Sequence, residues 1–173
     1  RCRVVVVCGL SMGGTLTLRL AELHPTAIAG IVLVNPSILS RQWNMKLLPL
    51  MKHVIPSVAG IASDIAAPAA VEEGYTRTPL KAVDSLRRGW KTVRADLRTI
   101  RMPVLLLHSA TDHVVDPENS RVLMEEIGTD DLTEVVLQRS YHVATLDYDA
   151  PEIFARSVEF IERVAASRTK EAV

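Results

Sequence analysis

The sequence lacks several features that mark large functional classes. It has no apolar run near the 18 residues of a membrane-spanning helix, so we expect no membrane span. Its 20 basic and 20 acidic side chains cancel, and the basic ones do not cluster on one segment. Because nucleic-acid phosphates bind clustered lysine and arginine, this distribution argues against a nucleic acid as partner. Repeats and low-complexity tracts are also absent.

Cysteine is scarce, and its two copies are too far apart to pair. Cys2 and Cys8 lie along one predicted strand, with Cα atoms about 20 Å apart, far beyond disulfide reach. Unpaired cysteines favour a reduced, cytoplasmic setting. No spacing of histidine, cysteine and aspartate is typical of a metal site, since His108 and His113 form only a lone pair. We therefore predict neither a disulfide nor a bound metal.

An initiating methionine and a signal peptide are missing as well. Arg1 leads straight into a valine-rich strand pattern, which is an unusually abrupt beginning for a natural chain. This start predicts that the 173 residues are the carboxyl-terminal part of a longer protein, so that an export signal could lie upstream.

What is present is the composition of an ordinary globular domain, with 48% apolar and 23% charged residues. Strand and helix patterns alternate along the chain, and the first strand pattern is typical of a parallel strand buried on both faces. The alternation predicts an α/β fold with a parallel sheet flanked by helices. The expected strands span residues 3–8, 28–34, 102–108 and 132–138. The expected helices between or after them span residues 12–23, 117–127 and 151–166.

The pattern changes in the middle of the chain. Residues 37–99 show short helical stretches rich in alanine, leucine, methionine and proline, with no strand pattern between them. A connection of about 60 residues is too long for a plain crossover between strands. We therefore predict a helical insertion at 37–99 between two parts of one core, residues 1–36 and 100–173.

The segment Gly9–Gly14 fits the pattern G-x-S-x-G and lies between a predicted strand and a predicted helix. A serine in such a sharp turn has a strained backbone, and the glycines let neighbouring chain approach without a Cβ clash. The Ser11 hydroxyl then projects above the sheet. The N–H of Met12 and the amino end of the helix face negative charge that develops during reaction.

A hydroxyl is a poor nucleophile at neutral pH, so Ser11 needs a base, and that base needs an orienting carboxylate. Asp112 follows the third predicted strand and His142 follows the fourth, in the chain order that this motif is known for. Both lie at the carboxyl ends of parallel strands, where open α/β sheets place their sites. We predict that Ser11, His142 and Asp112 approach one another within hydrogen-bonding range.

Other acidic residues and histidines near these loops have simpler explanations. Asp116, beside a proline, suits a helix N-cap, and Asp147 is expected to order the loop in which it lies. His113 should point away from the site, and His108 fits a hydrogen-bonded histidine at the end of a buried strand.

In Gly9–Gly14, Asp112–Pro117 and His142–Asp147 the sequence resembles bacterial carboxylesterases and monoacylglycerol lipases of the α/β-hydrolase family. The stretch Tyr75–Pro79 looks like the end of that family's cap, and the resemblance covers nearly the whole chain. It implies a serine hydrolase that acts, without a cofactor, on a small-molecule substrate: a short- or medium-chain carboxylic ester or a monoglyceride.

The resemblance also implies a role for each residue. Ser11 would be the nucleophile, His142 the general base and then acid, Asp112 the orienting carboxylate, and the Met12 N–H one oxyanion donor. The family has several strands before the serine, with a His-Gly loop that supplies a second donor, and none of these is in the chain. The edge of its first strand would then lie bare, which favours aggregation.

The sequence leaves substrate and activity open. Apolar residues of the insertion, among them Trp43, Leu47 and Met51, favour an apolar acyl group, but plain helix packing explains them equally well. A non-catalytic binding protein of the same fold or an inactive fragment is an alternative to ester hydrolysis. Hydrolysis of a thioester, a peptide or a carbon–carbon bond is another. The oligomeric state is not determined.

Overall fold

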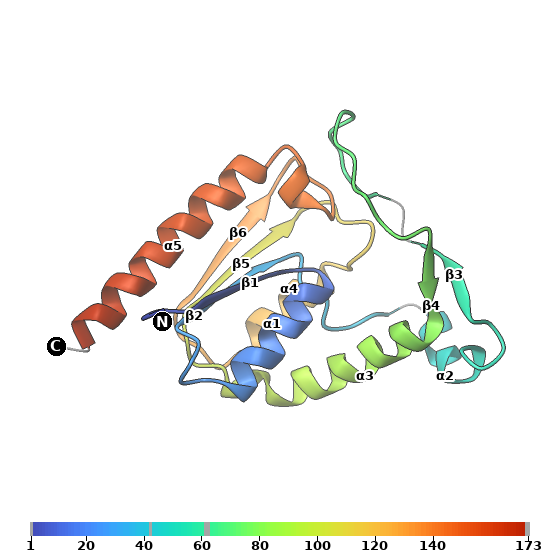
Figure 1. Ribbon diagram of the computed structural model, residues 1–173, viewed down its shortest axis with the longest axis horizontal. Coiled ribbons are helices and arrows are strands. Elements are labelled where there is room, and N and C mark those ends of the chain that lie inside the picture. Colours follow the sequence, from blue (N-terminus) through green and yellow to red (C-terminus); the bar gives the residue numbers. More distant parts are fainter. Residues whose placement is uncertain (1, 42, 61–62, 172–173) are drawn as a thin grey trace.

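A computed structural model describes residues 2–41, 43–60 and 63–171 of the chain, and its centre is a parallel sheet (Figure 1). Four strands pair in the order β1-β2-β5-β6, all of them parallel. This arrangement confirms the predicted α/β architecture. The strands are β1 (Val6–Leu10), β2 (Gly30–Val34), β5 (Val104–Ser109) and β6 (Leu132–Leu137).

Helices cover both faces of this sheet, and each face has its own apolar core. On one face, side chains of three helices pack against β2 and β5, with Leu18, Val93 and Leu123 fully or almost fully buried there. On the other face, Phe160 and Val164 of the last helix pack against the same two strands. The helices are α1 (Met12–Leu23), α3 (Leu80–Asp96), α4 (Glu118–Glu126) and α5 (Ala150–Glu171).

The prediction that the first strand is buried on both faces is wrong. In the part of the chain that the structure describes, β1 pairs only with β2 and forms the edge of the sheet. Val5, just before β1, is 43% exposed, and Cys8 within it is exposed as a free thiol. The valine-rich run is typical of a central strand, but burial also depends on a neighbour on the second side. The expected bare edge is therefore present.

The segment between β2 and β5 contains a small sheet that the sequence pattern did not predict. Strands β3 (Ser57–Ala59) and β4 (Arg77–Pro79) pair antiparallel, away from the main sheet (Figure 1). Each strand has only three residues, too few to show the alternation that identifies a strand. The guanidinium of Arg77 ties the pair together by donating to the hydroxyl and the carbonyl of Ser57.

Short helices complete this segment, and its boundaries as a separate unit, 37–99, stay a prediction. Helix α3 runs from the small sheet back to the core, where it lies beside α1 (Figure 1). The buried carboxylate of Asp84 on α3 pairs with Lys52, which follows α2. The short helices are η1 (Trp43–Lys46), α2 (Leu48–Met51) and η2 (Leu97–Thr99), and η3 (Ala144–Leu146) lies after β6.

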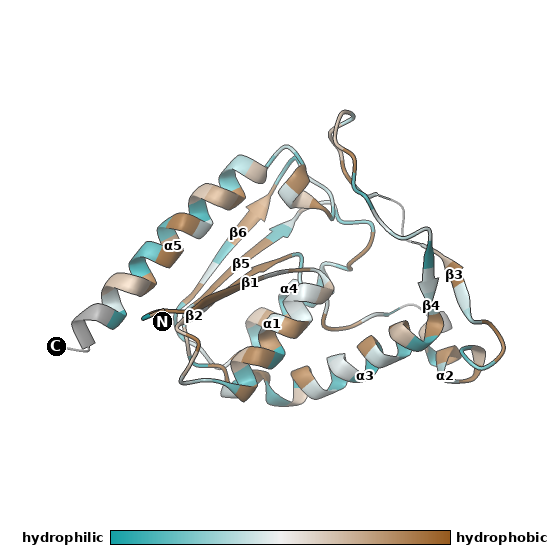
Figure 2. Cartoon of the chain, viewed as in Figure 1, coloured by the Kyte–Doolittle hydropathy of each residue, from teal (hydrophilic) through white to brown (hydrophobic). Residues whose placement is uncertain are grey.

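None of the described helices is both long and apolar enough to cross a membrane. Even α5, with 22 residues, mixes apolar and polar side chains along its length (Figure 2). Its apolar residues Ile153, Phe160 and Val164 pack on the sheet, as expected for an amphipathic surface helix.

Candidate active site

Ser11 lies in a sharp turn between β1 and α1, with the backbone angles φ 55° and ψ −118°. Such positive φ values are uncommon in residues other than glycine and store strain that the surrounding structure must hold. Here the Ser11 N–H donates to the carbonyl of Val34 at 3.0 Å, and the Ser11 carbonyl accepts the N–H of Ser37 at 3.1 Å. The predicted strained turn from strand to helix is therefore present, fastened to the end of β2.

Two glycines around Ser11 are required by close packing. A Cβ atom on Gly9 would lie 2.3 Å from the carbonyl oxygen of Gly13, and one on Gly14 would lie 2.7 Å from the Cβ of Pro36. A Cβ on Gly13 would meet no described atom within 4 Å. The expectation that glycines avoid a Cβ clash is confirmed for Gly9 and Gly14, but it does not hold for Gly13 against the described neighbours.

His142 and Asp112 form a buried pair at the same end of the sheet. The Nδ1 atom of His142 is 2.8 Å from Oδ2 of Asp112, and the two side chains are 6% and 4% exposed. Oδ1 of Asp112 accepts the N–H groups of Val114 and Val115, each at 2.8 Å. An ionised carboxylate only accepts hydrogen bonds, so Asp112 favours the tautomer of His142 that carries its proton on Nδ1. In neutral histidine, Nε2 is then unprotonated.

Nε2 is thus available to take a proton, and the predicted donor of that proton is Ser11. Among the described residues, the hydrogen bonds of Ser11 all use its backbone, and its hydroxyl forms none. The predicted contact between Ser11 and His142 therefore stays a prediction. Catalytic hydrogen bonds are often long in free enzymes and shorten when substrate binds.

Two consecutive residues at the end of β2 hold the Ser11 turn and the His142 loop at the carboxyl end of the sheet. The carbonyl of Val34 accepts the Ser11 N–H at 3.0 Å. The side-chain amide of Asn35 donates to the carbonyl of His142 at 2.8 Å, and its oxygen accepts the N–H of Ser109 at 2.8 Å. The end of β2 therefore holds both the Ser11 turn and the His142 loop.

Sequence reasoning missed this role of Asn35. The residue is 2% exposed and has a φ of 44°, a conformation that asparagine tolerates better than most residues. An asparagine directly after a buried strand was the available signal, because a buried amide must find hydrogen-bond partners.

The expected roles of the other candidates are largely observed. Asp116 accepts the N–H of Glu118, the first residue of α4, but the N-cap position itself is Pro117 and not Asp116 as expected. Asp147 accepts the N–H of Tyr141 at 2.9 Å and thus orders the loop around His142. His108 is hydrogen-bonded as expected, to a carboxylate of β6 at 2.7 Å, though its side chain is partly exposed.

His113 points away from Asp112, as expected, and lies 2.8 Å from a carboxylate oxygen of Asp64. Asp64 also accepts the backbone N–H of His142 at 3.1 Å. It comes from the segment between β3 and β4, and no sequence signal pointed to it.

The described hydrogen bonds of the site do not involve Leu47 or Met51, two of the residues predicted to bind substrate. The side chain of Trp43 is outside the described part of the structure. Leu47 is 48% exposed just before α2, and Met51 at the end of α2 is partly buried. Their proposed contact with an acyl group stays a prediction.

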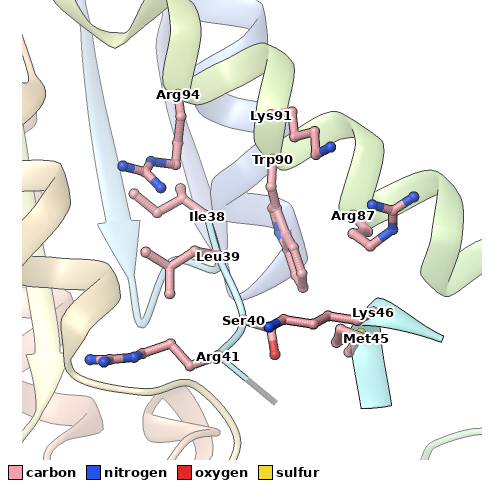
Figure 3. Close-up of a pocket in the computed structure, with 10 residues that line it drawn as sticks. All are labelled: Ile38, Leu39, Ser40, Arg41, Met45, Lys46, Arg87, Trp90, Lys91 and Arg94. Atoms are coloured by element: carbon pink, nitrogen blue, oxygen red, sulfur yellow. The ribbon is translucent and has the colours of Figure 1, made fainter. Parts of the chain in front are cut away.

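A pocket of about 510 Å³ lies between the loop after β2 and helix α3 (Figure 3). The indole of Trp90 points into the space above Ser40 and Met45. Neither Ser11 nor His142 is among the described residues that line the pocket, so it does not identify the acyl site. Its described lining combines apolar and cationic side chains: Ile38, Leu39, Ser40, Arg41, Met45, Lys46, Arg87, Trp90, Lys91 and Arg94.

Metal-binding chemistry finds no support in the described ranges. No group of three or more histidine, cysteine, aspartate or glutamate side chains there could hold a metal ion.

Comparisons with known proteins place this geometry in context. Residues 1–149 match the model of the family described as "Serine aminopeptidase, S33". The chain is 41% identical over 170 residues to the thermostable monoacylglycerol lipase of Bacillus sp. (strain H-257), covering 95% of this chain and 65% of the relative. It is 26% identical over 165 residues to a carboxylesterase of Bacillus subtilis (strain 168), covering 92% of this chain and 64% of the relative. The chain therefore spans less than two thirds of the length of these relatives.

A solved structure shares the fold closely. It is described under the metagenome-derived lipolytic enzymes LipS and LipT, and it superimposes with a TM-score of 0.90 at 35% identity. The match covers 94% of this chain and 66% of that chain. This likeness confirms the α/β-hydrolase fold that the sequence predicted.

Proposed function

The chain belongs to the serine aminopeptidase S33 family, and on that premise we propose that it carries the nucleophile, base and orienting acid of a serine-dependent carboxylic-ester hydrolase. The observation that carries the proposal is the buried pair of His142 and Asp112, held at the same carboxyl end of the sheet as the strained Ser11 turn. His113 also lies beside a carboxylate that accepts two backbone N–H groups, but its side chain is 57% exposed, whereas that of His142 is 6% exposed.

In the proposed reaction, Ser11 Oγ bonds to the carbonyl carbon of the ester while His142 Nε2 takes the serine proton. The carbonyl electron pair moves to the oxygen. The N–H of Met12 is free to stabilise that oxyanion, because the first residue of a helix has no carbonyl within the helix to donate to. When the tetrahedral intermediate collapses, the ester carbon–oxygen bond breaks, and the leaving alcohol takes the proton from His142.

Water then completes the proposed cycle. His142 Nε2 removes a proton from the water as its oxygen attacks the acyl-serine carbonyl. Collapse of the second intermediate returns the proton to Ser11 Oγ and releases the carboxylic acid. Throughout, Asp112 keeps the imidazole oriented and stabilises its positive charge without taking the proton.

For the substrate we propose short- or medium-chain carboxylic esters or monoglycerides. The support is the similarity to a thermostable monoacylglycerol lipase and to a carboxylesterase. We also propose a cytoplasmic location, because Cys2 and Cys8 are both free thiols. Subcellular fractionation of the native host tests the location.

The test of the enzyme proposal compares three variants of the full-length protein on p-nitrophenyl butyrate and on a monoglyceride. Ser11→Ala and His142→Ala should each lower kcat by several orders of magnitude, since such residues act as a unit. Ser85→Ala, which changes an exposed serine on α3, is the matched control and should keep parent turnover. A fluorophosphonate should label the parent and the control but not Ser11→Ala. A parent that neither turns over nor labels would instead be a non-catalytic binding protein.

A further inference from the structure

Asp64 connects the insertion to both loops of the proposed site with a single carboxylate. Its Oδ2 accepts the backbone N–H of His142 at 3.1 Å and that of His113 at 3.2 Å. Its Oδ1 lies 2.8 Å from the imidazole Nδ1 of His113, the neighbour of Asp112. The Asp64 side chain is 14% exposed. These contacts cross 78 residues of sequence to one loop and 49 to the other.

The stretch of the insertion around Asp64 forms further hydrogen bonds with the loop that contains His142. The carbonyl of Asp64 accepts the N–H of Val143 at 3.1 Å. Asp147, in the loop after His142, accepts the N–H groups of Ala66 and Ala67 at 2.8 and 3.0 Å. We call residues 64–67 the latch segment, because side chains on both partners bind backbone groups of the other.

The charge of Asp64 suits this role. Burial by itself raises its pKa, but the hydrogen bonds from His113 and from the backbone N–H groups of His142 and His113 outweigh burial and lower the pKa below its ordinary value. Asp64 is therefore ionised at neutral pH. An ionised carboxylate only accepts hydrogen bonds, which matches the two backbone N–H groups that face it.

We propose that Asp64 is a positioning residue of this hydrolase, which sets the main chain of His142 relative to the Asp112 loop when the latch segment is seated. The inference rests on the proposed ester-hydrolase function. Asp64 does not contact the reacting atoms. It acts through His142, whose backbone nitrogen it fixes two bonds from the imidazole-bearing Cβ.

The expected size of the effect follows from the geometry of catalysis. A misplacement of about 1 Å in a catalytic group can cost roughly 100-fold in rate. Removal of the Asp64 carboxylate does not remove the hydrogen bond between the His142 and Asp112 side chains. It does remove the acceptor that holds the backbone N–H of His142, so the main chain that carries the imidazole can shift. We therefore expect Asp64→Ala to lower kcat by about 10- to 100-fold, with little change in KM.

The conservative variant should rescue much of this loss. Asparagine keeps one oxygen for the two backbone N–H groups of His142 and His113. Its amide then faces the Nδ1 atom of His113, which accepts a hydrogen bond when the imidazole proton is on Nε2. Asp64→Asn should therefore retain a clearly higher kcat than Asp64→Ala.

The matched control is Asp84→Ala. Asp84 is also a buried carboxylate of the insertion, but its partners are Lys52 and Arg87, far from either catalytic loop in the hydrogen-bond network. Asp84→Ala should lower the melting temperature and leave kcat near the parent value. A merely structural role for Asp64 would make the two alanine variants behave alike.

The experiment measures kcat and KM of the full-length protein and its variants on p-nitrophenyl butyrate, together with amide hydrogen exchange. Asp64→Ala should accelerate exchange in the latch segment and at residues 141–144, more than elsewhere in the chain. If Asp64→Ala does not fold, Asp64→Ser tests the same point, because its shorter side chain withdraws the acceptor. Parent-like kcat in a folded Asp64→Ala or Asp64→Ser variant, or an equal loss in Asp84→Ala, overturns the positioning role alone. If the parent itself shows no Ser11-dependent hydrolysis, the proposed function falls and the positioning role falls with it.

Discussion

Replacement of Asp112 by asparagine should switch the proposed base off while leaving its position almost unchanged. The reason is the way in which Asp112 is held. Its Oδ1 accepts two backbone N–H groups, from Val114 and Val115, and its Oδ2 accepts Nδ1–H of His142. An asparagine has one oxygen and one NH2 group to satisfy these three donors.

The two backbone donors decide which way the amide turns. If the oxygen faced His142, the NH2 group would point at the N–H groups of Val114 and Val115, and two buried donors would lose their acceptor. Each such loss costs about 1–3 kcal/mol. The oxygen therefore stays with the backbone, and the NH2 group faces Nδ1 of His142, which must then accept a hydrogen bond.

This forces the imidazole proton onto Nε2, the atom that has to receive the proton of Ser11. The corresponding change in a serine protease lowers kcat about 10,000-fold, and we expect a loss of that order here. It equals roughly 5 kcal/mol in the activation free energy. Stability should change little, because both backbone bonds survive.

The assay is the steady-state hydrolysis of p-nitrophenyl butyrate by the full-length protein, with the melting temperature measured in parallel. Asp116→Asn is the matched control in the same loop, since its remaining oxygen still accepts the Glu118 N–H. A folded Asp112→Asn variant with kcat within tenfold of the parent would refute the tautomer reasoning. A large loss in Asp116→Asn would show that the loop, and not the tautomer, is responsible.

Three further predictions concern stability. Burial raises the pKa of Glu22 from 4.5 to about 7, so its charged form opposes folding above neutral pH. Glu22→Gln should therefore raise the melting temperature at pH 8 but not at pH 4, and an equal shift at both values would contradict the cause. Hydrogen bonds from Lys52 and Arg87 hold the pKa of Asp84 at about 2, so Asp84→Asn should destabilise the protein at pH 7 and lose that effect as pH falls from about 4 towards 2 in thermal melts. Gly9→Ala should lower the yield of folded protein far more than Gly13→Ala in paired expression tests, because only the first Cβ meets the backbone, and equal yields would refute the packing reason.

Much of the fold could be predicted from the sequence where local pattern and structure coincide. The helix expected at residues 12–23 is α1 (Met12–Leu23), since a glycine turn precedes it and His24 and Pro25 follow it. Strands expected from apolar runs are present within a few residues. The edge position of β1 could not be predicted in this way, because the neighbours of a strand are set by pairing across the sheet and not by its own composition.

The candidate site shows the same division. Asp112 and His142 could be located because each follows a strand at its carboxyl end, which is a property of chain order. Asn35 and Asp64 could not, because their roles depend on contacts with the His142 loop that cross 107 and 78 residues. Nothing in the local sequence of Asp64 separates it from an ordinary surface carboxylate of an insertion.

The His142 loop shows why the position of a site residue cannot be predicted from the neighbouring sequence alone. Between β6 and α5 it has only the short helix η3, so most of its backbone groups cannot pair with one another. Side chains satisfy them instead: Asn35 and Ser109 bind carbonyls of the loop, while Asp64 and Asp147 bind its N–H groups. These partners come from the end of β2, the end of β5, the insertion and the loop itself. The backbone of the His142 loop is therefore held by side chains from four places in the chain, so the position of the proposed base depends on the assembled fold.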